Sequence, residues 1–336
     1  MSSQTQDAAA GVEAGGDQPA DETTCPCCRL PAAVVVNWLS SITGRSRLES
    51  ARMLRAEVDL IGHNVREQAK SFGLQSHHLN DRMMEFYAST DAFLFETASW
   101  NACPMKAKMR ADVCQMLAQH LPAGARVLCF GDGMGFDSAA VSLAGFKTTC
   151  FEISGPCLKF AERLIAYRGA DVEICTDTAK FGANSFDAIV CLDVLEHVED
   201  PRGMLAAFSG WLRPGGMLIA HAPFYHVDST RPTHLKSNKR FAGLVYSLYR
   251  PSGFRLVEVG GWLLDPIALV LGEDGPRPSL WTRVKTFGGQ MLCYGARFLP
   301  FMPSLAARFA VRVHPKWKQD LDRVVASAEA GSSPAS

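Results

Sequence analysis

The chain lacks basic residues in one long stretch and acidic residues in another, and it has no long apolar run at its start. Residues 1–24 contain no Lys or Arg and are rich in Ala, Gly, Ser, Gln and Thr, so we expect them to form a disordered acidic tail. Without a basic start and an apolar run, they do not resemble a secretory signal. We therefore expect a cytoplasmic protein.

Paired cysteines are also scarce. The eleven cysteines include one dense cluster, Cys25, Cys27 and Cys28, in which Cys25 and Cys28 have the spacing of a zinc knuckle. The second pair of such a site is missing, and the other cysteines are scattered singly. We predict no metal site, with a zinc that uses a distant partner (His63, His77 or Cys103) as the open alternative. Most thiols should be reduced and buried.

The most informative segment that is present spans residues 126–137. An apolar run at 127–130 suits a buried strand, and Gly131, Gly133 and Gly135 follow at alternate positions. Glycines allow positive φ and let a ligand approach the backbone closely, so a nucleotide-like ligand is the first hypothesis. A dinucleotide fingerprint would need glycine where the chain has Phe136, which makes an NAD-dependent oxidoreductase a distant alternative.

Strands and helices alternate after this loop. Strands are predicted at 146–151, 172–175, 186–192 and 216–221, and each ends at or beside a polar residue (Glu152, Asp177, Asp193 and His221). This rhythm indicates a doubly wound parallel sheet whose ligand lies at the carboxyl edge. Glu152 follows Gly131 by 21 residues, a spacing that suits a carboxylate accepting both hydrogen bonds of a ribose diol.

Five motifs in this order resemble the class I S-adenosylmethionine-dependent methyltransferases, most closely the subgroup that modifies small molecules and quinones. They are the glycine loop at 127–135, Glu152, Asp177-Thr-Ala, residues 185–201 and the turn at 212–216. The resemblance covers about residues 105–260. It implies a Rossmann-like, mostly parallel seven-stranded sheet, S-adenosylmethionine as cofactor, and methyl transfer to a small or lipid-like acceptor.

The resemblance also implies the cofactor contacts. The methionine part would face the three glycines, the ribose would meet Glu152, the adenine edge would meet Asp177, and the sulfonium would lie near Asp193. The full predicted set is Gly131, Asp132, Gly133, Gly135, Glu152, Ile153, Asp177, Thr178, Ala179, Asp193 and Val194. Where the family commonly carries an acid, this chain has Cys129. Asp132 is therefore the candidate to hold the methionine amino group.

Methyl transfer needs an aligned nucleophile and, where that nucleophile is protonated, a base. The candidates are His197, His221, His226 and His234, and we rank His197 and His226 first as catalytic residues because histidine titrates near neutral pH. Asp193, Glu196 and His197 fall on one face of a helical segment and could instead gather a divalent metal. Capping and packing are the favoured roles, since three such ligands form an incomplete shell.

The chain is long enough for more than one unit. We expect a helical N-terminal extension at 25–104 with helices over 48–69 and 80–97, a cofactor-binding domain at 105–272, a basic aromatic helical segment at 273–325, and a disordered tail at 326–336. The aromatic residues of the extension suit a packed core, with stacking on a flat acceptor as the alternative.

Residues 275–319 contain no Asp or Glu and eight Lys or Arg interleaved with aromatic rings. Two interpretations stay open: a helical lid packed on the sheet, or a stretch from Gly275 to Gln319 lying on an anionic membrane. Prolines and charges exclude a spanning helix there, and the dispersed basic residues argue against nucleic acid. The partners we expect are a small-molecule acceptor and, on the second interpretation, the membrane periphery.

One alternative belongs to a different class of protein. Because fold does not determine function and Cys129 departs from the family pattern, the chain could be an accessory or regulatory protein that binds S-adenosylmethionine without transferring its methyl group. The sequence gives no prediction of oligomeric state.

Overall fold

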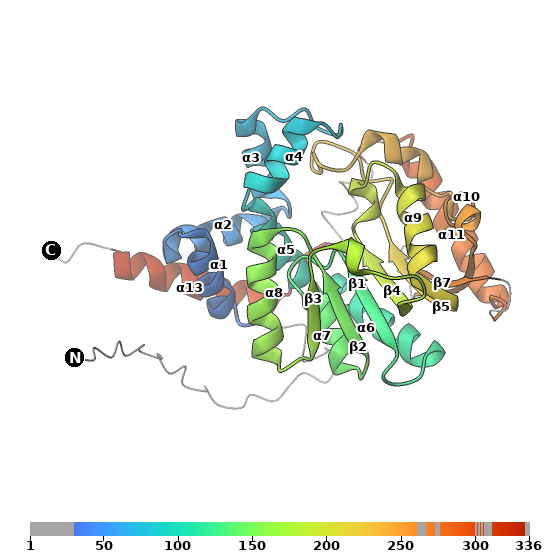
Figure 1. Ribbon diagram of the computed structural model, residues 1–336. Coiled ribbons are helices and arrows are strands. Elements are labelled where there is room, and N and C mark those ends of the chain that lie inside the picture. Colours follow the sequence, from blue (N-terminus) through green and yellow to red (C-terminus); the bar gives the residue numbers. More distant parts are fainter. Residues whose placement is uncertain are drawn as a thin grey trace, which may run out of the picture.

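The computed structural model describes residues 30–260, 267–272, 276–299, 301, 303, 305 and 311–332. A seven-stranded sheet with helices on both faces forms its centre (Figure 1). The predicted tail at 1–24, the cluster Cys25, Cys27 and Cys28, and residues 333–336 lie outside the described residues.

The strand order is β3-β2-β1-β4-β5-β7-β6. All neighbours pair in parallel except β7, which runs antiparallel to β5 and β6. The strands are β1 (Arg126–Phe130), β2 (Lys147–Phe151), β3 (Val172–Cys175), β4 (Phe186–Leu192), β5 (Leu212–His221), β6 (Phe254–Val259) and β7 (Ile267–Leu271). The predicted doubly wound, mostly parallel, seven-stranded sheet is confirmed.

Successive side chains of β1 belong to two different hydrophobic cores, one on each face of the sheet. Val127 and Cys129 of β1 face α6 (Pro104–His120) and α7 (Phe136–Leu143), whereas Leu128 and Phe130 face α9 (Pro201–Trp211). Successive side chains of a strand point to opposite faces, so nearly continuous apolar strands are needed where both faces are covered. The helix that follows β2, α8 (Gly155–Arg168), packs on α7 and α1.

The N-terminal extension contains more helices than predicted. They are α1 (Ala32–Thr43), α2 (Arg47–Asp59), α3 (His63–Phe72), α4 (Asp81–Ser89) and α5 (Ala92–Asn101). The single helix predicted over 48–69 is wrong because Gly62 has φ of +87° and breaks it. The helix predicted over 80–97 is wrong because Thr90 is extended and its Oγ1 accepts the Ala92 amide, which starts a new helix.

The predicted basic segment 273–325 divides into two separate parts. Helix α11 (Leu280–Ala296) packs on β6 near α10 (Val245–Tyr249), whereas α13 (Pro315–Ser332) lies beside α1 and α2 at the other end of the molecule (Figure 1). Trp317 is buried and its Nε1 donates to the Leu30 carbonyl oxygen at 3.1 Å. The interpretation of this segment as a single lid over the sheet is therefore wrong.

Helix α13 also extends into the predicted disordered tail. The prediction of disorder is wrong over 326–332, because the apolar face of the helix, with Leu321 and Val324, is buried in the core formed with α1 and α2. Among the helices in the described part of the chain, none is both long and apolar enough to cross a membrane.

Candidate active site

The glycine loop between β1 and α7 requires glycine at both of its ends. Gly131 and Gly135 have φ of +69° and +78°, a region that side chains rarely adopt. A Cβ on Gly131 would lie 2.7 Å from Cγ2 of Val194, and one on Gly135 would lie 2.9 Å from Cβ of Ala161. The loop is therefore packed tightly between the residue after Asp193 on one side and α8 on the other.

Glu152, at the end of β2, contacts this loop directly. Its Oε2 accepts the Gly133 amide at 2.9 Å, and its Oε1 accepts the amides of Ile153 and Ser154, each at 2.8 Å. A carboxylate has about four acceptor positions, so the group can also accept hydrogen bonds from a ribose. The Ile153 side chain is exposed beside it.

Asp177 follows β3 on the same edge of the sheet. Its Oδ1 accepts the Ala179 amide at 2.9 Å and caps the short 3-10 helix η2 (Thr178–Lys180). Because β3, β2, β1 and β4 are consecutive parallel neighbours, Asp177, Glu152, the glycine loop and Asp193 lie in a row along one carboxyl edge. The structure brings the predicted cofactor residues together, and their contacts with the cofactor stay predictions.

Cys129 and Asp132 differ from the expectation for the methionine end. Cys129 is buried in the core between β1 and α6, and burial raises the pKa of its thiol well above the usual value. Asp132 accepts the amides of Asp137 and Ser138 at 3.0 and 2.7 Å. Burial, together with the Asp137 charge, raises the pKa of Asp132 to about 7. Its carboxylate is thus directed at the start of α7, and a bond to the methionine amino group stays a prediction.

Asp193 is held by side chains from three other elements. It follows β4 with φ of +59°, and its Oδ2 accepts from Trp100 Nε1 at 3.0 Å and from Lys106 Nζ at 3.2 Å. Its Oδ1 lies 2.6 Å from Nδ1 of His221. Burial alone would raise the pKa of Asp193, but Lys106 and His221 outweigh burial and hold that pKa well below its usual value. The carboxylate is ionised at neutral pH.

Ion pairs link Asp193 to Asp137, which lies in the first turn of α7 after the glycine loop. Lys106 also pairs with Asp137 at 3.3 Å, and Arg110 Nε donates to Asp137 at 2.8 Å. Both cations are buried, with 4% and 1% of their surface exposed. Sequence reasoning missed Lys106 and Arg110. In the sequence these two cations stand four residues apart, on one face of the predicted helix. The same pattern is typical of a solvated helix surface, so it does not indicate a buried site.

The histidines occupy two different settings. His197 Nδ1 lies 3.1 Å from the Tyr87 hydroxyl and 3.2 Å from the Thr233 carbonyl oxygen, and His226 Nε2 lies 3.2 Å from the Thr230 hydroxyl. Burial lowers the pKa of His197 and of His226 to about 4. His221, which sequence reasoning ranked below them, instead pairs with Asp193, and the choice of His197 and His226 as catalytic residues stays a prediction.

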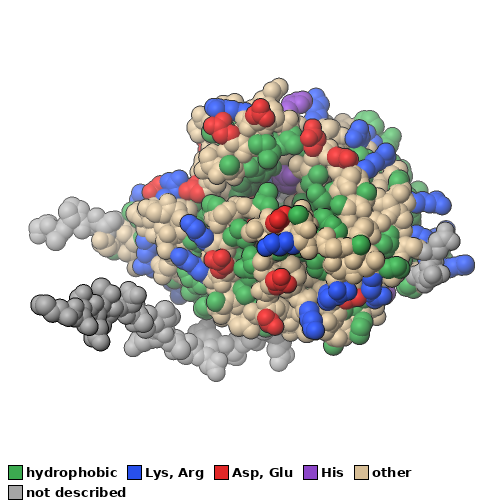
Figure 2. All heavy atoms as spheres, viewed as in Figure 1, with side chains coloured by type: hydrophobic (Ala, Val, Ile, Leu, Met, Phe, Trp, Pro, Cys, Tyr) green, Lys and Arg blue, Asp and Glu red, His purple; other side chains and the backbone are tan. Residues whose placement is uncertain are grey.

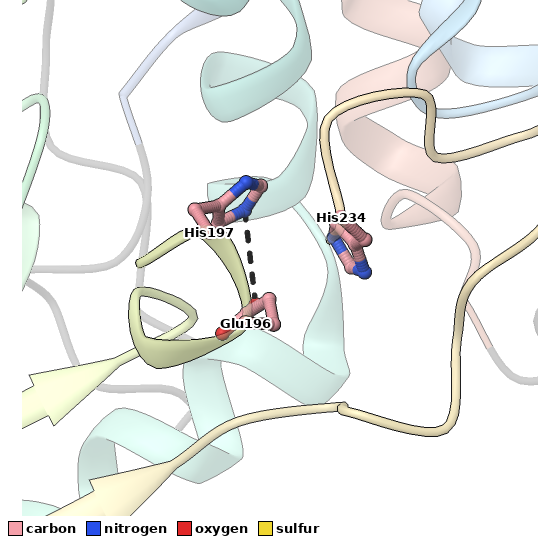
Figure 3. Close-up of side chains that lie close together, drawn as sticks. All are labelled: Glu196, His197 and His234. Carbon is pink, nitrogen blue, oxygen red and sulfur yellow. Dashed lines mark ion pairs between the residues drawn. The ribbon is translucent and has the colours of Figure 1, made fainter. Parts of the chain in front are cut away.

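The side chains of Glu196, His197 and His234 point toward one another (Figure 3), with one ligand atom from each lying within 4.8 Å of the others. Oε2 of Glu196 is buried and has no hydrogen-bond partner in the described part of the structure. Asp193 does not complete this set, as the alternative interpretation required, because its oxygens are engaged by Trp100, Lys106 and His221. Two imidazoles and one carboxylate suit a transition-metal ion such as Zn²⁺.

A cavity of about 90 Å³ adjoins His221. Its wall is mainly apolar and comes from the end of β5, the loop after it, and the inner face of α11, with His221, Tyr225, Tyr249, Gly289 and Cys293 among the lining residues. It lies on the Asp193 side of the site. This position suits an acceptor more than the cofactor, whose predicted residues run toward β3.

Comparisons with known proteins identify the domain that carries these residues. Residues 128–220 match the family described as "Methyltransferase domain". A ubiquinone biosynthesis O-methyltransferase of Xanthomonas axonopodis pv. citri is 37% identical over 102 residues, which is 29% of this chain and 43% of that protein. The protein of the same name from Xanthomonas oryzae pv. oryzae is 38% identical over 105 residues, covering 29% and 42% of the two chains.

Among solved structures, an S-adenosylmethionine-dependent methyltransferase from Aquifex aeolicus is similar to this chain with 17% identity and a TM-score of 0.38, covering 48% of this chain and 90% of that one. This likeness is too weak to add to the argument.

Residues 128–220 therefore form a class I methyltransferase domain, and the prediction of S-adenosylmethionine as the cofactor of this domain is confirmed. The match spans less than half the length of the curated relatives.

Proposed function

We propose that this protein transfers the methyl group of S-adenosylmethionine to a hydroxyl of a small or lipid-like acceptor, with His221 as the general base. The observation that carries the proposal is the pair formed by Asp193 Oδ1 and His221 Nδ1 at 2.6 Å. It lies at the sheet edge where Val194 packs on Gly131 of the glycine loop. A histidine oriented by an ionised carboxylate is the usual arrangement of a base that activates a nucleophile.

The roles of the residues follow from this geometry. The bound cofactor supplies an electrophilic methyl group on a sulfonium. Asp193, kept ionised by Lys106, accepts a hydrogen bond from Nδ1–H of His221 and leaves Nε2 to take the acceptor's hydroxyl proton. Gly131, Gly133, Gly135 and Glu152 would hold the cofactor, which would give its methyl group to the deprotonated oxygen and keep the electron pair of the broken carbon–sulfur bond on sulfur. Trp100, which donates to Asp193, fixes the carboxylate in position.

Two observations support the class of acceptor. The cavity beside His221 is mainly apolar, which suits a ring or chain with little charge. The curated relatives are named as O-methyltransferases of ubiquinone biosynthesis, which supports an oxygen acceptor on a quinone-like ring. The alternative of a binding protein without transfer activity predicts tight cofactor binding and no product.

Calorimetric titration with S-adenosylmethionine and S-adenosylhomocysteine, followed by release of S-adenosylhomocysteine with hydroxylated prenyl-ring acceptors, tests the proposal. In His221→Asn we expect an unchanged dissociation constant for the cofactor and a loss of turnover of roughly 100-fold or more. His120→Asn, which alters a histidine paired with Glu258 instead, should retain turnover. Cofactor binding by the wild type without product would support the binding-protein alternative. Full turnover by His221→Asn would show that His221 is not the general base.

A metal-assisted form of the same transfer is the second candidate, because Glu196 lies close to His197 and His234 and its buried Oε2 has no hydrogen-bond partner among the described residues. Glu196, His197 and His234 would hold the ion, which would lower the pKa of an acceptor hydroxyl. Dialysis against a chelator followed by elemental analysis and a turnover assay distinguishes the two forms. Turnover by metal-free protein would exclude the second one.

A further inference from the structure

Helix α11 presents an apolar stripe to the solvent. Leu280, Val284, Phe287, Met291, Tyr294 and Phe298 repeat at intervals of four and three residues along α11 and just beyond its end, and all six are exposed. Phe287 is 66% exposed, and the neighbouring Trp281 is 69% exposed. This spacing normally marks the face that a helix buries in a core. Here the pattern points away from the core, so no element in the described part of the chain covers the stripe.

The opposite face of α11 fixes this orientation. It buries the small residues Thr286, Gly289 and Ala296 and packs on β6. A Cβ on Gly243 would lie 2.3 Å from the Gln290 carbonyl oxygen, so the two backbones approach closely. Rotating the helix to bury the large side chains would drive them into this contact. The exposed stripe is therefore a consequence of tight packing behind it.

The charges beside the stripe have one sign. Arg277, Arg283, Lys285 and Arg297 lie in or next to α11, and the sequence has no Asp or Glu from 275 to 319. The Arg297 guanidinium lies 5.2 Å from the Tyr294 ring centroid. In Figure 2, Lys and Arg side chains project from the edge of the molecule that carries α10 and α11. The remaining basic residues of the segment near Trp317 do not belong to this surface, because Trp317 is buried under α1 and α2.

We propose that α11 lies on an anionic lipid surface, with its apolar stripe among the acyl chains and headgroups and its arginines on the phosphates. Aromatic and basic residues on one helix favour this interface. A second copy of the chain would cover the stripe less well, since a symmetric dimer would bring two faces of the same positive sign together. This inference does not depend on methyl transfer. The inner face of α11 also lines the cavity beside His221, so on the proposed function the membrane would lie close to the acceptor.

Flotation of the full chain with vesicles of phosphatidylglycerol and phosphatidylcholine, or of phosphatidylcholine alone, tests this. We expect binding to the anionic vesicles that weakens with salt. Phe287→Ser combined with Met291→Ser should reduce the bound fraction at least tenfold, and Arg283→Glu should reduce it by roughly tenfold. Leu143→Ser and Arg47→Glu change an exposed apolar and an exposed basic residue elsewhere and should bind like the wild type. Circular dichroism and cofactor titration verify that each variant is folded.

Three results would overturn the inference. One is absence of binding to either vesicle type by the folded wild type. Another is equal binding by the wild type and the Phe287/Met291 double variant. The third is a dimer in vesicle-free sedimentation that Phe287→Ser dissociates, because the stripe would then be covered by a second copy.

Discussion

The two acids that define the edge of the sheet are held in opposite ways. Glu152, on the cofactor side, accepts only backbone amides, from its neighbours Ile153 and Ser154 and from Gly133, 19 residues earlier. Asp193, on the acceptor side, is held by side chains of Trp100 and Lys106 that come from helices 93 and 87 residues earlier. The cofactor side is thus built from local turns, whereas the acceptor side depends on the packing of the N-terminal extension against the sheet.

Among the tests of this contrast, removal of the Lys106 charge on the acceptor side should have the largest effect, a loss of stability. Lys106→Met keeps the volume and leaves Asp137 and Asp193 as buried carboxylates without this cation. Loss of one partner in a buried ion network costs about 3–5 kcal/mol, so we expect a fall of that size in the free energy of unfolding, measured by urea denaturation. Lys108→Met, on the same helix but more exposed, is the control. Equal stability of the Lys106 and Lys108 variants would show that the network is not an essential support of the acceptor side.

Glu152→Ala tests the cofactor side. Loss of a single charged hydrogen bond from the ribose to this carboxylate costs about 1.5–3 kcal/mol, so we expect binding of S-adenosylmethionine to weaken by at least roughly 10- to 100-fold. Calorimetric titration measures this change. Glu162→Ala, on α8, serves as a control at an exposed acid. Unchanged affinity in Glu152→Ala would place the ribose elsewhere.

The acceptor side should also be the more sensitive to acid. Burial lowers the pKa of His226 to about 4, below its unfolded value near 6.5, so the unfolded chain binds the proton first. The stabilising contribution is complete above about pH 6.5 and is lost as the pH falls toward 4. Between pH 7 and pH 5 the wild type should lose about 2 kcal/mol more stability than His226→Gln, as measured by denaturation at both pH values. Parallel losses in the two proteins would contradict the neutral, buried state.

The smallest effect is expected at Asp177. This acid is exposed, and one of its oxygens already caps η2 through the Ala179 amide. An exposed hydrogen bond contributes about 0.5–1.5 kcal/mol, so Asp177→Asn should weaken cofactor binding by less than roughly tenfold in the same titration. A loss larger than that of Glu152→Ala would reverse the ranking of the two acids.

The same contrast explains how far the sequence could predict this molecule. The strands from 126 to 221, the glycine loop and the acids at strand ends follow from local patterns, and a parallel sheet places all its carboxyl ends on one edge. The pairing of Asp193 with His221 follows from β4 and β5 being neighbours, in which Leu192 is opposite His221. Lys106 and Trp100 could not be found in this way, since helix periodicity does not specify which distant acid a buried cation meets.

The C-terminal helices show a second limit. Helices α11 and α13 both come from the predicted basic aromatic segment, yet Trp281 is 69% exposed and Trp317 is 8% exposed. Composition predicts that such rings seek an apolar environment and does not distinguish the protein's own core from an external surface. The deciding feature is the presence of α1 and α2 beside α13, which depends on the tertiary structure.

The packing of α13 against α1 and α2 has a consequence for how the chain folds as it is synthesised. The Leu30 carbonyl oxygen accepts a hydrogen bond from Trp317 Nε1, and the Ala32 amide donates one to Asp320 Oδ2, at separations of 287 and 288 residues. Helices α1 and α2 leave the ribosome well before α13, so the core that the three share cannot close until α13 has been made. Contacts of such long range form slowly, and until then the apolar faces of α1 and α2 are available to chaperones while the sheet assembles.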